Sequence, residues 1–287
     1  MKVGKVLLTG RPNSGKSTLL NNLLGHKVSI TSPKPQTTRF PLEAVYEDER
    51  GQIIFIDTPG MFGKAEDTLS RTINHNLEAF YKQEEFDLVV YVIDHTRSRD
   101  KEENRILGWV RKITKPKILV VNKADIKTPD FWAEYSFYEA EFQPVIQVSA
   151  LTHFNLNLLM NAIFDLLPIG EKLVDTTNMI QPGLNLDSKL YLSEIIREKV
   201  FLLMRKELPY TVQTQVDTIE NRNQHTLYIK GRIVTTADRY KVMIIGKNGA
   251  MIKEIGILTR KELEAATGKK IFLDLQVDVN PHWQETF

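Results

Sequence analysis

The sequence contains no cysteine, so disulfide bridges and thiolate metal sites are excluded for this chain of 287 residues. No apolar run approaches the roughly 18 residues that span a bilayer, and the N-terminus lacks the apolar stretch of a signal peptide. The sequence also has little excess of either charge, because it contains 38 Lys and Arg and 36 Asp and Glu. Bulk charge therefore does not indicate a nucleic-acid partner. We expect a cytoplasmic protein that is long enough for two domains.

Apolar runs alternate with helical patterns from residue 5 to about 168. The fully apolar run 88–93 is typical of a strand that is covered on both faces, as in a parallel sheet. The pattern predicts an α/β fold with a mostly parallel, doubly wound sheet. We expect strands at Lys5–Thr9, Leu42–Tyr46, Ile53–Asp57, Leu88–Asp94, Lys117–Asn122 and Val145–Ser149, with helices between them that include Asp100–Lys112 and Asn157–Leu167.

The order of elements changes after a stretch without periodicity. We expect a first domain at 1–170, a linker at 171–186 and a second domain at 187–287. The order α-β-β-α-α-β predicts an independent α+β domain. Its elements are a helix over Asp187–Glu207, strands at Thr211–Glu220 and His225–Thr235 joined by a polar turn at 221–224, two helices around Gly246–Gly249, and a strand at Lys270–Val279.

Residues Gly10–Ser17 form a complete G-x-x-x-x-G-K-[ST] phosphate-binding loop between a predicted strand and a predicted helix. The glycines let backbone N–H groups turn toward phosphate oxygens at the positive end of the helix. Lys16 should reach the β- and γ-phosphates, and the Ser17 hydroxyl should ligate Mg²⁺. The loop alone leaves ATP and GTP open.

Four later segments narrow the choice of nucleotide. Asp57–Gly60 ends a strand, where Asp57 can hold Mg²⁺ through water and the Gly60 N–H can sense a γ-phosphate. In Asn122–Asp125 the carboxylate of Asp125 can accept two hydrogen bonds from guanine, which adenine cannot supply. Ser149–Leu151 can present an N–H to the guanine O6, and the loop Gln36–Arg39 suits a threonine that ligates Mg²⁺ beside the γ-phosphate. Each segment alone also fits an ordinary turn or helix cap, but their order along the chain indicates a GTPase.

Met61 follows Gly60, at the position where Ras-type GTPases carry the glutamine that orients the attacking water. Methionine neither donates nor accepts a useful hydrogen bond. We therefore expect slow turnover unless a partner, an ion or another residue completes the site.

The second domain carries a G-x-x-G turn at Gly246–Gly249 between its two helices. Such a turn lets the backbone approach a phosphodiester closely, as in KH domains of type II, although a lone G-x-x-G is often only a helix connection. Basic residues surround the turn, which favours RNA binding over a merely solvated face. The expected RNA-binding residues are Arg232, Lys241, Ile245, Gly246, Lys247, Asn248, Gly249 and Lys253.

A GTPase domain followed by one type II KH domain resembles the bacterial Era family of ribosome-assembly GTPases. The likeness covers nearly the whole chain and includes the Gly-Arg-Pro-Asn form of the phosphate loop, Pro35–Arg39, Glu194–Lys199, Glu207–Tyr210 and Trp283. It implies that the KH domain binds the 3′ end of 16S ribosomal RNA during 30S subunit maturation. It also suggests peripheral contact with a membrane. It also implies that Thr38 ligates Mg²⁺ and that Asn13 holds a K⁺ ion in place of the absent glutamine. The stretch 61–67 and the region 130–142 depart from the family pattern.

The motifs predict a GTP-hydrolysing RNA-binding protein that uses GTP or GDP and Mg²⁺, and the resemblance to the Era family adds the role as an assembly factor and the K⁺ ion. The alternative is a GTP-sensing RNA adaptor whose hydrolysis is incidental, and a tandem GTPase is disfavoured because the sequence has one phosphate loop. The expected catalytic residues are Lys16, Thr38, Asp57 and Gly60. The expected nucleotide-binding residues are Asn13, Ser14, Gly15, Lys16, Ser17, Thr18, Asn122, Lys123, Asp125, Ser149, Ala150 and Leu151, with Mg²⁺ on Ser17, Thr38 and Asp57.

Overall fold

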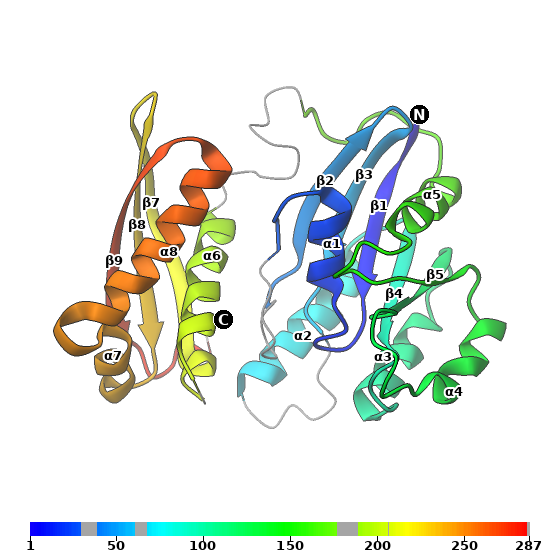
Figure 1. Cartoon of the computed structure of the whole chain (residues 1–287), viewed down its shortest axis with the longest axis horizontal. Helices are drawn as coiled ribbons and strands as arrows, with labels where there is room; N and C mark the ends of the chain where they lie inside the picture. Colours follow the sequence, from blue (N-terminus) through cyan, green and yellow to red (C-terminus); the bar gives the residue numbers. More distant parts are fainter. Residues whose placement is uncertain (30–38, 61–67, 177–188, 206, 286–287) are drawn as a thin grey trace. The chain divides into compact units, whose positions relative to one another are not determined.

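A computed structural model describes residues 1–29, 39–60, 68–176, 189–205 and 207–285 of the chain. The chain divides into two compact units, Met1–Leu184 and Asn185–Phe287. Each unit has its own sheet and its own helices, so each is described by itself (Figure 1).

The first unit is built on a six-stranded sheet with the strand order β2-β3-β1-β4-β5-β6. All neighbouring pairs are parallel except β2 with β3. The predicted α/β fold with a mostly parallel sheet is therefore confirmed. The elements are β1 (Lys2–Thr9), α1 (Lys16–Leu24), β2 (Leu42–Asp48), β3 (Gly51–Asp57), α2 (Thr68–Gln83), β4 (Leu88–Asp94), α3 (Lys101–Val110), β5 (Lys117–Asn122), α4 (Trp132–Tyr135), the short 3₁₀ helix η1 (Ser136–Ala140), β6 (Val145–Gln147) and α5 (Leu156–Leu166).

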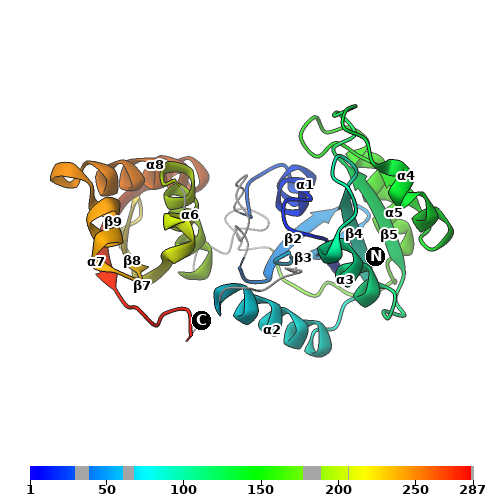
Figure 2. The same cartoon turned by 90° about the horizontal axis from the view of Figure 1, so that it is seen from below.

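Helices cover both faces of this sheet, which is why its central strands are apolar throughout. Figure 2 shows α1 on one side of the sheet and α2 and α3 on the other. On the α2 and α3 side, alternate strand residues such as Leu7, Tyr91 and Leu119 form one buried cluster with Leu77 and Ile106 of these helices. The carboxyl ends of β1, β3, β4 and β5 meet at one edge, where ligands bind in sheets of this class.

The strands β4 and β5 have the predicted bounds, whereas β6 ends at Gln147 instead of Ser149. Ser149 bridges to Phe154 and begins a turn, so the last predicted strand residues already belong to the loop at the sheet edge.

The first residues of the predicted linker lie along the first unit. The Gln52 carboxamide accepts hydrogen bonds from the backbone N–H groups of Leu173 and Val174 at 2.9 and 3.0 Å. Thr176 donates a hydrogen bond of 2.8 Å to Glu47. Residues up to 176 therefore follow β2 and β3, and the rest of the predicted linker lies outside the described residues.

The second unit has a three-stranded sheet in the order β7-β8-β9, antiparallel between β7 and β8 and parallel between β8 and β9. The predicted order α-β-β-α-α-β is confirmed. The elements are α6 (Lys189–Leu203), η2 (Leu208–Thr211), β7 (Val212–Asn223), β8 (Thr226–Thr235), α7 (Asp238–Ile245), η3 (Lys247–Gly249), α8 (Ala250–Thr267) and β9 (Lys270–Val279).

Two predicted boundaries in this unit are wrong. The first helix ends at Leu203, before the expected Glu207, because the chain enters the 3₁₀ turn that contains Pro209. Strand β7 continues through most of the expected polar turn to Asn223, with a register shift that absorbs the extra residue.

Candidate functional site

The phosphate loop fits its neighbours so closely that glycine is required at two positions. A Cβ on Gly10 would lie 2.2 Å from the carbonyl oxygen of Val92, and a Cβ on Gly15 would lie 2.2 Å from Nδ2 of Asn122. Gly15 also has a φ of 96°, in the left-handed region. Helix α1 begins at the next residue, so its free N–H groups face the loop.

Lys16 is buried and its ammonium lies inside the phosphate loop. Nζ donates hydrogen bonds to the carbonyl oxygens of Gly10 at 2.9 Å and Arg11 at 3.1 Å. Burial lowers the pKa of Lys16 to about 8, against the opposing charges of Asp57 and Glu103. A phosphate group would supply the negative charge that stabilises this ammonium.

Ser17 and Asp57, predicted as magnesium ligands, lie together. The Ser17 hydroxyl donates to Oδ2 of Asp57 at 2.6 Å, and Ser29 donates to the same oxygen at 2.8 Å. Asp57 is fully buried, and burial raises the pKa of its carboxyl group. Its other oxygen, Oδ1, is buried without a hydrogen-bond partner among the described residues. A hydroxyl beside a carboxylate with an unsatisfied oxygen is a donor set that fits Mg²⁺.

The segment Asn122–Asp125, which the sequence predicts to recognise the base, is hydrogen-bonded to both neighbouring loops. The Asn122 side chain donates to Ser14 O at 2.9 Å and accepts from Ala150 N at 3.0 Å. Ser149 donates to Oδ1 of Asp125 at 2.6 Å. Asn122 thus connects the phosphate loop to the segment after β6. Asp125 and Ser149, both predicted to contact the base, lie side by side.

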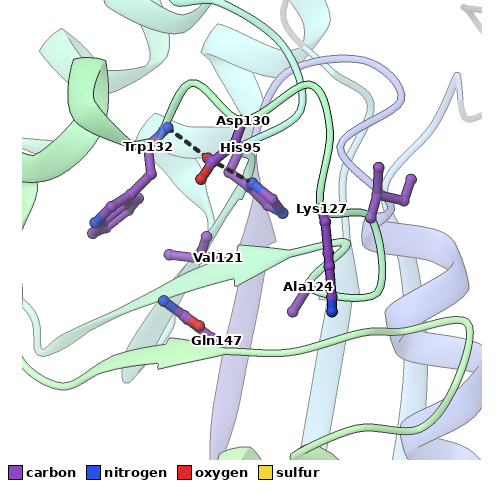
Figure 3. A pocket seen from close by; sticks show the side chains of 8 residues that line it. His95, Val121, Ala124, Lys127, Asp130, Trp132 and Gln147 are labelled. Atoms are coloured by element: carbon purple, nitrogen blue, oxygen red, sulfur yellow. Dashed lines mark hydrogen bonds and ion pairs between the residues drawn. The ribbon is translucent and has the colours of Figure 1, made fainter.

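The imidazole ring of His95 contacts the segment Asn122–Asp125. One ring nitrogen lies 3.1 Å from Lys123 O and the other lies 3.1 Å from Oδ1 of Asp130 (Figure 3). Lys123, whose φ is 68°, also forms an ion pair of 2.6 Å with the buried carboxylate of Asp94. A cavity of about 300 Å³ adjoins these groups, lined by His95, Val121, Ala124, Ile126, Lys127, Asp130, Trp132 and Gln147.

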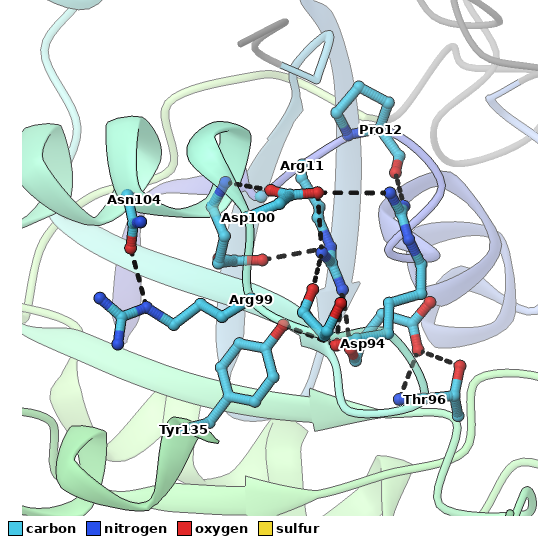
Figure 4. Close-up of polar contacts among 12 residues, drawn as sticks. Arg11, Pro12, Asp94, Thr96, Arg99, Asp100, Asn104 and Tyr135 are labelled. Atoms are coloured by element: carbon cyan, nitrogen blue, oxygen red, sulfur yellow. Dashed lines mark hydrogen bonds and ion pairs between the residues drawn. The ribbon is translucent and has the colours of Figure 1, made fainter. Parts of the chain in front are cut away.

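Arg11, the second residue of the phosphate loop, is fully buried and binds the segment after β4. Its guanidinium donates to the carbonyl oxygens of Ser98 at 2.9 Å and Asp94 at 3.0 Å (Figure 4). Its Nε lies 3.2 Å from the buried carboxylate of Glu103. Burial raises the pKa of the Glu103 carboxyl, while the Tyr91 hydroxyl and Arg11 oppose the change. Arg97 of the same segment donates to Pro12 O at 3.0 Å, so the phosphate loop is held from outside as well.

Tyr81, which no sequence motif marks, links α2 to the carboxyl edge of the sheet. Its hydroxyl lies 3.1 Å from Oγ1 of Thr9 and 3.2 Å from Oγ1 of Thr58. Thr58 in turn donates to Leu8 O at 2.7 Å. We also did not predict Arg11, Ser29 and His95 as site residues. Arg11 occupies a variable position of the phosphate-loop motif, and no short motif marks Ser29 or His95.

The turn Gly246–Gly249 has the geometry of a tight backbone loop between α7 and α8. Gly246, Asn248 and Gly249 all have left-handed φ values, 73°, 52° and 74°. A Cβ on Gly246 would lie 2.8 Å from the Cβ of Met251, so a side chain cannot be placed there without displacement. The N–H groups of Gly246 and Gly249 donate to the carbonyl oxygens of Val242 at 2.9 Å and Gly246 at 3.1 Å, so the turn is held by its own backbone.

Unpaired basic side chains lie on the turn and on both helices beside it. Lys241, Lys247 and Lys253 have no ion pair or side-chain hydrogen bond within the described ranges. Arg232 differs, because it donates to Asp217 at 2.7 and 2.9 Å. It alternates along β8 with Gly231 and Ile233, and Gly231 packs on α6, so Arg232 points to the opposite face of the sheet.

Several predicted positions remain predictions. Thr38 and Met61 lie outside the described residues. Gly60 lies against the phosphate loop, where a Cβ would be 2.4 Å from Pro12 N. Leu151 is 72% exposed, so only its backbone is placed near Asp125 and Ser149. Ser14 is buried, while Thr18 and Ile245 are half-buried.

Within residues 1–29, 39–60, 68–176, 189–205 and 207–285, no helix is both long and apolar enough to cross a membrane. In the same ranges, no three His, Asp or Glu side chains gather into a metal site. A magnesium ion that takes most of its ligands from phosphate and water needs no such cluster.

Comparisons with known proteins extend over the whole chain. Residues 5–123 match the family model described as 50S ribosome-binding GTPase, and residues 207–284 match the KH domain model. GTPase Era of Halothermothrix orenii is 38% identical over 99% of this chain and 95% of that protein. GTPase Era of Aquifex aeolicus is 39% identical over 99% of this chain and 96% of that protein.

Solved structures give the same answer. A crystal structure of Era in complex with MgGDPNP and nucleotides 1506–1542 of 16S ribosomal RNA has a TM-score of 0.88 and 37% identity, covering 99% of this chain and 95% of that chain. A crystal structure of an Aquifex aeolicus Era variant bound to GDP·AlF₄⁻ also has a TM-score of 0.88 and 37% identity, covering 99% and 96%. The nucleotide-site motifs, the two matched domains and these full-length relatives show that the chain is a GTP-hydrolysing enzyme of the Era family.

Proposed function

We propose that this GTPase binds the 3′ region of 16S ribosomal RNA through its second unit and acts in maturation of the 30S subunit in the cytoplasm. One observation carries the proposal: the same chain contains a guanine-nucleotide site and a G-x-x-G turn whose neighbouring lysines have no ion pair within the described part of the chain. An Era structure with 16S ribosomal RNA nucleotides matches this chain over nearly its full length. The functional boundaries are 1–170 for the GTPase domain, 171–186 for the linker and 187–287 for the KH domain.

In the nucleotide site, each group has a separate task. Lys16 and the N–H groups at the start of α1 bind phosphate oxygens, and Asp125 with Ser149 reads the guanine edge. Ser17, Asp57 and Thr38 hold Mg²⁺, which would neutralise charge on the β- and γ-phosphates when bound. Gly60 presents its N–H to the γ-phosphate. Asn122 keeps the phosphate loop and the segment after β6 at a fixed separation.

We assign the positioning of the attacking water to a K⁺ ion on Asn13, since Met61 cannot orient it. Asn13 has a left-handed φ of 64°, which asparagine and glycine adopt at low cost. Asn13→Gly therefore keeps the backbone and removes the carboxamide. Turnover should rise when NaCl is replaced by KCl in the wild type and should not respond in Asn13→Gly. Equal turnover in both salts would overturn the assignment.

The test of the main proposal is single-turnover GTP hydrolysis with and without an RNA of the 16S 3′ end. Acceleration by this RNA, but not by an RNA of scrambled sequence, supports an assembly factor whose hydrolysis is coupled to RNA. Tight RNA binding without any change in hydrolysis supports the alternative, a GTP-sensing adaptor. Peripheral membrane contact enters only through the family resemblance, and sedimentation with anionic-lipid vesicles tests it.

A further inference from the structure

A cavity of about 450 Å³ lies between helices α2 and α3, and none of the predicted nucleotide-binding residues lines it. Its walls are polar side chains from both helices, and its apolar part is the ring of Trp109. The lining residues are Glu78, Lys82, Asn104, Arg105, Gly108, Trp109 and Lys112. We call this feature the α2–α3 groove.

Gly108 lies inside α3, where glycine lowers helix stability by about 0.5–1 kcal/mol relative to alanine. A Cβ at Gly108 would meet no atom within 4 Å. Packing among the described residues therefore does not explain the glycine. Its effect is to leave the groove open down to the backbone of α3, so that another chain can approach closely.

The floor of the groove connects directly to the nucleotide site. The ring of Trp109 stacks on Tyr81, with 3.7 Å between ring centroids and 22° between planes. The Tyr81 hydroxyl contacts Thr9 and Thr58, which adjoin the phosphate loop and Asp57. Tyr81 therefore connects Thr58 to the groove floor through one side chain.

The rim of the groove is basic. Arg105 forms an ion pair of 2.7 Å with Glu78. Lys82 and Lys112 are exposed, and neither has an ion pair or side-chain hydrogen bond in the part of the chain that the structure describes. The groove thus offers two uncompensated positive charges beside an aromatic floor.

We propose that the α2–α3 groove docks an acidic segment of a protein partner, and that the bound nucleotide sets its affinity. An apolar side chain of the partner packs on Trp109 and Gly108, and its carboxylates pair with Lys82 and Lys112. A protein segment fits better than RNA because one face of the Trp109 ring is already covered by Tyr81, and two lysines form a short site for a phosphate backbone.

A displayed library of random peptides tests the docking site while the partner protein is still unidentified. The library is selected on the full chain loaded with GDPNP and counter-selected on Gly108→Leu, which fills the groove. We expect enriched peptides with Asp or Glu on both sides of an apolar residue. Their affinity should fall about tenfold or more in Lys82→Glu/Lys112→Glu and should be unchanged in Lys115→Glu, an exposed lysine outside the groove.

Three results would overturn the docking proposal. They are enrichment of peptides that bind Gly108→Leu equally well, enrichment without acidic residues, and displacement of the peptides by polyuridylic acid. GTP hydrolysis of Gly108→Leu is measured in parallel and should equal that of the wild type, since Gly108 lies outside the nucleotide site. A normal rate of GTP hydrolysis together with no groove-dependent peptide would overturn the docking proposal and leave the proposed function unaffected.

The nucleotide coupling rests on the proposed guanine-nucleotide site and has its own readout. In the wild type, the affinity of a selected peptide should differ between the GDPNP and GDP forms. Tyr81→Phe keeps the stacked ring but removes the hydroxyl that contacts Thr58, so the ratio of the two affinities should move toward one. Equal affinities in the wild type, or an unchanged ratio in Tyr81→Phe, would overturn the coupling.

Discussion

The phosphate loop and the Gly246–Gly249 turn are both glycine-rich backbone loops beside a helix N-terminus, yet their surroundings are opposite. Around the phosphate loop the charged groups Lys16, Arg11 and Asp57 are buried and hydrogen-bonded to backbone carbonyls or to serine hydroxyls. Around the second turn Lys241, Lys247 and Lys253 have no ion pair among the residues that the structure describes, and Lys247 is exposed. A buried set of fixed groups suits one small ligand with defined chemistry, whereas exposed lysines suit a long polyanion that exchanges its counterions.

The largest difference between the two regions should appear on removal of a buried charge. Arg11→Met leaves Glu103 buried without its cation, which costs about 3–5 kcal/mol of unfolding free energy. Arg97→Met is the matched control, because Arg97 is 39% exposed and loses mainly a hydrogen bond to Pro12. Urea denaturation of both variants measures the difference. Similar free energies of unfolding for Arg11→Met and Arg97→Met would contradict the stabilising role of the buried Arg11–Glu103 ion pair.

Base recognition gives the next largest effect. Asp125→Asn keeps an oxygen that can accept from Ser149 but replaces the second acceptor with a donor, so the guanine edge loses a partner. GTP affinity should fall about 100-fold or more, and xanthosine triphosphate should bind better than GTP. Fluorescent-nucleotide titration measures both affinities.

The exposed residue Asp165 provides the control for charge alone. Asp165→Asn should leave the affinity for GTP unchanged. Unchanged GTP affinity in Asp125→Asn would remove Asp125 from the base-reading site.

At the second turn, effects should be smaller and should depend on salt. Lys247→Ala/Lys253→Ala should lower the affinity for the 16S 3′-end RNA and reduce the slope of log affinity against log salt by about 2. Lys261→Ala removes an exposed lysine farther along α8 and should change neither quantity by as much. An affinity loss that is the same at low and high salt would mean that these lysines do not contact phosphates.

The same comparison explains how far the sequence could predict the two regions. Local motifs mark Lys16, Ser17, Asp57 and Asp125, because each motif follows the carboxyl end of a strand. The structure places these motifs at the same edge of the sheet. Arg11, Tyr81 and His95 act through contacts with residues distant in the chain, and no local pattern marks such contacts. Arg232 was predicted from charge alone, but the alternation of β8 turns it to the face opposite α6, where Asp217 binds it. Charge density in a sequence does not report which face of a strand carries it.

The smallest predicted effect is a dependence of nucleotide affinity on pH, which arises from the buried lysine Lys16. Burial lowers the pKa of Lys16 to about 8 in the free protein, and bound phosphate should raise it again. The contribution of the ammonium to nucleotide affinity is therefore nearly complete about one pH unit below this pKa and is lost as the pH rises through it. Affinity for GDP should fall about fourfold between pH 7.0 and 8.5. Lys16→Met should bind weakly with no such decline, and a flat profile in the wild type would show that burial of Lys16 does not perturb its titration.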